Sequence, residues 1–216
     1  MLFKDTYCKH CKTGKGIMLT TQIKNKEEII SKLSGSTFII KCIGCKEVLF
    51  PETEIDKFIS ENIEKNKITG RLKIDYLCNQ DFSQAYINNH KVEIEKAETI
   101  LVFSCGVGVQ VMASLLENKK VITGCDTIYI NGFQGLTVQN YNCAQCGNCY
   151  LNYTAGICPI TACSKGLLNG SCGGAKNGKC EVNKDFDCGW EKIYNRLLKL
   201  NKKPKEEILI RDYSNL

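Results

Sequence analysis

The residues of this chain best suited to chemistry are cysteines, and eight of its fifteen cysteines lie between residues 143 and 188. They begin with Cys143-x-x-Cys146-x-x-Cys149, which is followed by Cys158-Pro159. Three cysteines at every third position and a more distant Cys-Pro are the ligand pattern of a cubane iron–sulfur cluster. Thiolates are soft ligands, so they select iron–sulfur clusters, zinc or Cu(I) over hard cations. The pattern therefore predicts a protein that transfers electrons.

The other cysteines of this tail extend the pattern beyond one cluster. Eight thiolates suffice for two [4Fe–4S] clusters, or for one cluster and one tetrahedral zinc ion. In two-cluster ferredoxins the cysteine of the Cys-Pro pair ligates the other cluster, and Cys158 can do the same here. We predict that the ligands of one or two clusters are Cys143, Cys146, Cys149, Cys158, Cys163, Cys172, Cys180 and Cys188.

A second group of cysteines follows short apolar segments that have the pattern of buried strands. Each of four such segments is followed by one cysteine. The carboxyl ends of parallel strands lie along one edge of a sheet, where ligands bind in open α/β folds. These cysteines can instead be ordinary buried residues, since cysteine is common in protein cores. We predict a further cluster with the ligands Cys42, Cys45, Cys78 and Cys105, and with Cys125 as a spare.

The first residues offer a rival use for two of these sulfurs. Cys8-x-x-Cys11 and Cys42-x-x-Cys45 together can form a zinc ribbon, with His10 as a possible substitute ligand. The two pairs are thirty residues apart, which is longer than the ~15–20 residues typical of such ribbons. Zinc at one site therefore remains an alternative to a cluster.

Helical and strand patterns alternate along the first two thirds of the chain. Strands are predicted at 38–40, 72–77, 99–103 and 121–122, and helices at 27–33, 51–63, 83–87 and 107–116. Such alternation predicts a parallel sheet with helical crossovers. We expect an α/β fold with three parts: a cysteine-containing leader (1–22), a small Rossmann-like domain (23–135) and an irregular cysteine-rich iron–sulfur domain (136–216) with a helix from Trp190.

Composition narrows the class of protein. No apolar run reaches ~18 residues, so no membrane span is expected, and without a signal peptide the chain is expected to be cytoplasmic. In that compartment cysteines are more often metal ligands than disulfides. The formal charge of +6 would fall to +2 with two clusters and to zero with three, and the basic residues are scattered, which argues against a nucleic-acid partner.

Two further patterns bear on catalysis and cofactors. With only two histidines in the chain, no acid–base or nucleophilic constellation emerges, so we expect no catalytic residues. Cys105-Gly106-Val107-Gly108 is similar to a nucleotide-binding turn, but the motif fails at Val111. We expect the free N–H groups of this helix start to stabilise the edge of an anionic cluster instead.

The segment from Cys146 to Gly170 resembles the methylenetetrahydrofolate reductase C-terminal domain family, and the likeness continues through Cys172-Gly173-Gly174 and Cys188-Gly189-Trp190. The part from about Lys24 is similar to the small iron–sulfur partner subunit of the acetogen-type reductase. The resemblance implies electron transfer between a donor complex and a separate flavin-dependent catalytic subunit. That family has a third cysteine shortly after the second one of its first site and then a Gly-Gly, which residues 46–51 do not offer.

We therefore expect an electron-transfer subunit of a methylenetetrahydrofolate reductase. The chain is too short to add a (β/α)₈ barrel, which needs ~250 residues, so flavin and folate would bind to the partner. One alternative is a zinc-stabilised interaction module with no electron-transfer role. Another is a stand-alone redox sensor whose cluster decays in oxygen.

Overall fold

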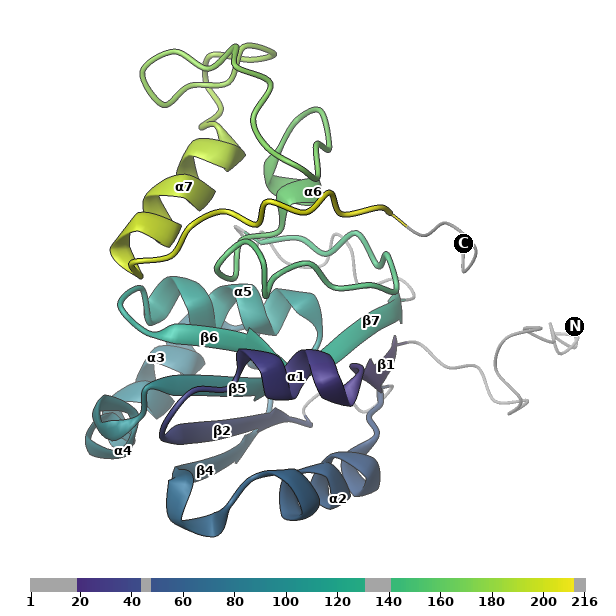
Figure 1. The fold of residues 1–216 in the computed structure, drawn as a ribbon, viewed down its shortest axis with the longest axis vertical. Helices are drawn as coiled ribbons and strands as arrows, with labels where there is room; N and C mark the ends of the chain where they lie inside the picture. The colour runs from purple at the N-terminus through teal and green to yellow at the C-terminus, as the bar shows by residue number, and fades with distance from the viewer. Residues whose placement is uncertain (1–18, 44–47, 131–140, 212–216) are drawn as a thin grey trace, which may run out of the picture.

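Four parallel strands form the central sheet of the computed structural model, which describes residues 19–43, 48–130 and 141–211 (Figure 1). The strand order is β4-β2-β5-β6. The bounds are β2 (Thr37–Cys42), β4 (Ile68–Ile74), β5 (Thr99–Phe103) and β6 (Lys120–Thr123). All residues of β5 are buried, because a central parallel strand is covered on both faces.

Helices cover both faces of this sheet. On one face, α1 (Lys26–Lys32) and α2 (Glu52–Asn62) enclose a core centred on Phe103. On the other face, α3 (Gln80–Asn89), α4 (Lys91–Lys96) and α5 (Gly106–Leu115) enclose a core centred on Phe38. A short 3₁₀ helix, η1 (Lys65–Lys67), precedes β4. These layers make the predicted α/β fold.

A second sheet of three strands lies beside the first, in the order β3-β1-β7. Its strands are β1 (Leu19–Ile23), β3 (Val48–Leu49) and β7 (Cys125–Ile130). β1 pairs with β3 in parallel and with β7 antiparallel. The sequence did not predict this sheet, because β1 and β7 carry polar residues such as Gln22 and Asp126 instead of continuous apolar runs.

The cysteine-rich region follows at one end of the molecule, at the top of Figure 1. Its helices are α6 (Pro159–Ala162) and α7 (Gly189–Lys199). α7 buries Trp190, Ile193 and Leu197 in a small core of its own. The indole Nε1 of Trp190 donates to the carbonyl of Leu167 at 2.8 Å, so Trp190 anchors both α7 and the loop before it.

The α/β class and the parallel sheet are confirmed, while several predicted elements shift. The strand predicted at 72–77 is β4, which begins four residues earlier and ends at Ile74. The weak helix at 83–87 is the longer α3, and α4 was missed. None of the helices in the described ranges is long and apolar enough to span a bilayer. Cys8, His10, Cys11, Cys45 and the predicted domain boundary at 135 lie outside the described residues.

Candidate metal centres

Three thiols gather at the carboxyl edge of the parallel sheet. Cys42 is the last residue of β2, Cys78 lies in the turn after β4, and Cys105 is the N-cap of α5. In the sheet, β4 lies on one side of β2 and β5 lies on the other side. The strand order therefore changes direction between β2 and β5. Open α/β sheets bind ligands at such a switch point. We call Cys42, Cys78 and Cys105 the first cysteine set.

The first cysteine set lies at the start of α5. Burial raises the pKa of the Cys105 thiol to about 11, although the backbone N–H groups of Gly108 and Val107 oppose the rise. Negative charge on Cys42 or Cys78 would raise it further, which places the three sulfurs within electrostatic reach of one another. A metal that binds here must therefore displace protons from the thiols.

Four of the tail cysteines line one small cavity between α5 and α6. They are Cys143, Cys146, Cys149 and Cys158, and we call them the second cysteine set. Cys158 thus lines the same cavity as the three cysteines of the opening motif. Gly106 forms part of the same cavity, and a Cβ at this position would lie 3.1 Å from the Cys143 sulfur.

Strand β7 holds the loop that carries the second cysteine set. The carboxylate of Asp126 accepts a hydrogen bond from the N–H of Cys149 at 2.7 Å. The carbonyl of Thr127 accepts one from the N–H of Gly147 at 3.1 Å. The Thr127 hydroxyl accepts from the N–H of Gly106 at 3.0 Å, which joins β7 to the start of α5. These contacts explain why polar residues occupy a buried strand.

Gln110, on α5, forms hydrogen bonds to the backbone beside the first cysteine of the second set and at its last cysteine. Its Nε2 donates to the carbonyl of Asn142 at 2.8 Å and to that of Gly106 at 3.1 Å. Its Oε1 accepts from the N–H of Cys158 at 3.4 Å. The side chain is buried, and a buried amide with several partners fixes the backbone that it joins.

Cys149 is the buried thiol of the second set, and Cys143, Cys146 and Cys158 are partly buried. Burial raises the pKa of Cys143 to about 12, against a hydrogen bond from the N–H of Gln145. Burial also raises the pKa of Cys149 well above its usual value, and the nearby Lys24 ammonium counteracts part of this rise. Without a bound cation these groups are therefore neutral thiols at physiological pH.

The remaining tail cysteines line a separate cavity at the tip of the molecule. They are Cys163, Cys172, Cys180 and Cys188, and we call them the third cysteine set. Lys165 lies close enough to interact electrostatically with Cys172 and Cys180. A hydrogen bond with Ser164 lowers the pKa of Cys180. Within this set Cys172 is exposed, whereas Cys188 is as buried as Cys149 is in the second set.

The three sets form a row. The thiols of Cys105 and Cys143 interact electrostatically, which makes the first and second sets neighbours across the start of α5. Helix α6 joins the second and third sets, because Cys158 is its N-cap and Cys163 its C-cap. Five residues of α-helix advance the chain by about 7.5 Å. Neighbouring sets are therefore close in space as well as in sequence.

The donor sets fit an iron–sulfur cluster in their chemistry. Each tail set offers four soft thiols around its own cavity, and no disulfide joins any two of the described cysteines. Within the described ranges, no three His, Cys, Asp or Glu side chains lie close enough to hold a single metal ion. Four thiols around one cavity are a soft donor set that either a cubane or a zinc ion can use.

Not every predicted residue lies in a set. Cys125 begins β7 and packs into the core under α1 and α2, so it is a buried core residue. No role was predicted from the sequence for Lys24, Gln110, Asp126 or Thr127. A glutamine within an apolar helix and an Asp-Thr directly after a strand are signals for the last three. No sequence signal identifies Lys24, because nothing in the sequence distinguishes a buried lysine from the exposed lysines near it.

Comparison with known families now bears on this tail. Residues 122–214 match the family described as methylene-tetrahydrofolate reductase C terminal, somewhat less than half of the chain. The C-terminal part of the chain is thus similar to this family. The match includes the second and third cysteine sets and β7, and it does not reach the first set. The predicted resemblance is thereby confirmed for the tail. No curated protein and no solved structure matches the chain.

Proposed function

We propose that this chain is an iron–sulfur subunit that passes electrons to a separate flavin-containing methylenetetrahydrofolate reductase subunit. One observation carries the proposal: the eight tail cysteines divide into two sets of four, each around its own cavity, within a segment similar to the reductase C-terminal family. When bound, [4Fe–4S] clusters supply one-electron transfer. The second and third sets would each hold one cluster, and the first set is the candidate for a third.

The chain's own residues would prepare these sites. Gln110, Asp126 and Thr127 fix the backbone around the second set. Burial keeps water from the Cys149 sulfur, and hydrogen bonding and solvent exposure around the sulfurs set cluster potentials. The row of sets would allow charge to move from the accessible tip toward the sheet, or in the opposite direction, over short steps.

The proposal is tested by colour and by coupling to a partner. An anaerobically purified chain should show broad visible absorbance that a reductant bleaches, whereas a zinc module is colourless because the zinc d shell is full. The reduced chain should then be reoxidised by the flavin-containing reductase subunit in the presence of methylenetetrahydrofolate. A colourless chain, or a coloured one that the reductase subunit does not reoxidise, would contradict the proposed role.

A further inference from the structure

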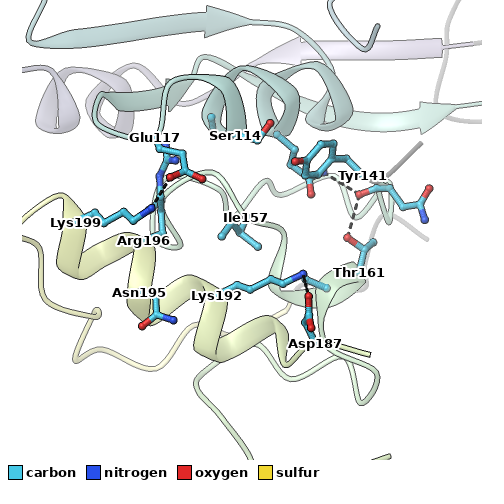
Figure 2. A pocket seen from close by; sticks show the side chains of 15 residues that line it. Ser114, Glu117, Tyr141, Ile157, Thr161, Asp187, Lys192, Asn195, Arg196 and Lys199 are labelled. Carbon is cyan, nitrogen blue, oxygen red and sulfur yellow. Dashed lines mark hydrogen bonds and ion pairs between the residues drawn. The ribbon is translucent and has the colours of Figure 1, made fainter. Parts of the chain in front are cut away.

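A cavity of about 480 Å³ lies between α5, α6 and α7, outside the three cysteine sets (Figure 2). Its volume falls within the roughly 300–1,000 Å³ range of small-molecule sites. Small and aliphatic side chains supply an apolar part of its wall, namely Ala113, Ala155, Ile157 and Ala162. Tyr141, Asn142 and Thr161 add an aromatic ring and neutral polar groups. The lining is thus of the mixed kind that holds small organic molecules.

One face of α7 presents three cations to this cavity. Lys192, Arg196 and Lys199 stand at i, i+4 and i+7, a spacing that places side chains on one side of a helix. Lys192 pairs with Asp187 at 2.8 Å, and Lys199 pairs with Glu117. Figure 2 shows both of these contacts at the cavity wall.

Arg196 differs from the two lysines. Its residue exposure is 7%, and among the described carboxylates none forms an ion pair with it. Its Nη2 donates to the carbonyl of Leu116 at the end of α5, at 2.9 Å. Its Nε is buried without a hydrogen-bond partner. A buried donor without an acceptor is destabilising, and more so when it is charged, so an anion that accepts from this guanidinium would be stabilising.

The surroundings of Arg196 add to the surplus of positive charge. Burial lowers the pKa of Lys202 to about 8, and the neighbouring cations Lys120, Lys32 and Arg196 lower it further. Burial also lowers the pKa of Arg196, although Glu117 and Tyr141 act in the opposite direction. An anion close to Arg196 would raise the pKa values of both Arg196 and Lys202.

We propose that this cavity binds a small organic molecule with one carboxylate or phosphate group, whose anion pairs with Arg196. A guanidinium is the side chain best matched to these groups, because its donors can bond both oxygens of the anion. The apolar part of the ligand would lie against Ile157 and the alanines. None of the cysteines in the three sets lines this cavity, so the proposed site does not need metal on them.

The test uses the anaerobically purified full chain and three probes in isothermal titration calorimetry: benzoate, phenyl phosphate and the neutral benzamide. We expect saturable binding of one or both anions and none of benzamide. Arg196→Gln should weaken anion binding by roughly tenfold or more. The matched control Arg71→Gln changes an exposed arginine on β4 and should bind as the unaltered chain does.

Ser114→Phe is a second variant, which fills the cavity and leaves its charges in place. It should abolish binding, and it decides the matter if Arg196→Gln does not fold. A preference for benzoate would identify a carboxylate ligand, and a preference for phenyl phosphate a phosphate ester. The proposal is overturned if neither anion binds, if benzamide binds as tightly, or if the folded variants bind as the unaltered chain does.

Discussion

Lys24 is a fully buried cation whose partners lead directly to the second cysteine set. Its side chain is 1% exposed, and its ammonium contacts Asp126 at 2.7 Å and Glu28 at 3.2 Å. Burial lowers the pKa of Lys24, but the Asp126 carboxylate outweighs burial, so the net pKa is raised and the group stays charged. Since Asp126 also accepts the N–H of Cys149, this buried pair positions a predicted cluster ligand.

Removing that ammonium should be costly. In Lys24→Met, Asp126 loses its cation in an interior where burial already raises its pKa, and breaking a buried pair in this way costs about 3–5 kcal/mol. Urea unfolding measures the loss. The control Lys26→Met changes an exposed lysine and should stay within about 0.5 kcal/mol. Equal stability of the two variants would show that the pair does not stabilise the fold.

Lys202 should make stability depend on pH. Its pKa is lowered from 10.5 to about 8 in the folded chain, chiefly by burial and then by nearby cations. The unfolded chain therefore binds this proton more tightly, and the lysine destabilises the fold as pH falls from about 10.5 through about 8.

We expect Lys202→Met to be more stable than the unaltered chain at pH 7, with a gain that shrinks as the pH rises toward 10. Urea midpoints measured across this range provide the check. Lys203→Met alters the exposed neighbour and should show no such trend. The predicted sign is wrong if Lys202→Met is not more stable than the unaltered chain at pH 7, or if its gain in stability grows with pH.

At the scale of elements, the contact between α6 and α7 holds the tip together. A Cβ added to Gly189, the first residue of α7, would lie 2.4 Å from the carbonyl oxygen of Ala162, the last residue of α6. This oxygen belongs to the backbone, which cannot move aside as a flexible side chain can. The glycine thus allows Cys163 and Cys188, which flank this contact, to face the same cavity.

Gly189→Ala should push α7 away from α6 and destabilise the tip. Overpacking of this kind typically costs about 1–3 kcal/mol, and proteases should cleave faster in the loops of the third set. Thermal unfolding and limited trypsin digestion measure both effects, with Ser171→Ala as an exposed control that leaves every trypsin site in place. If Gly189→Ala unfolds at the same temperature as the control and is digested at the same rate, the close contact is unimportant.

Elements with strong apolar patterns were predictable, and those built around the site were not. β5 and α5 follow from the run Thr99–Phe103 and from the apolar helix after Cys105. α4 was missed because Ile94 is its one buried residue among charged neighbours. β7 was missed because Asp126 and Thr127 serve the second cysteine set. The local sequence pattern indicates which apolar residues are buried. The burial of a polar residue depends instead on partners that lie far along the chain.

For the molecule as a whole, spacing predicted the ligands but not their division into sets. The sequence could not decide whether Cys158 belongs with the opening motif, because ferredoxins use that position for the other cluster. Only the path of the chain through α6 separates Cys158 from Cys163. Likewise, the sequence placed Cys125 at the sheet edge, and its side chain turned out to lie in a core.

The proposed clusters rest on the division of the tail cysteines into two sets and on the similarity of the tail to the reductase family. Such clusters would also explain the formal charge of +6, because each cubane held by four thiolates adds a charge of about −2. A loaded chain would be nearly neutral. We therefore expect the loaded chain to have a lower isoelectric point than the metal-free chain, which isoelectric focusing under exclusion of air can show.

Iron and acid-labile sulfide per chain, measured on protein purified without exposure to air, test the central claim most directly. With clusters in the second and third cysteine sets we predict about eight irons and as many sulfides, and about twelve if the first set is also filled. Replacing the third set by serines should remove about four of each. Fewer than about three irons per chain, with zinc or no metal on the thiols, would contradict the claim.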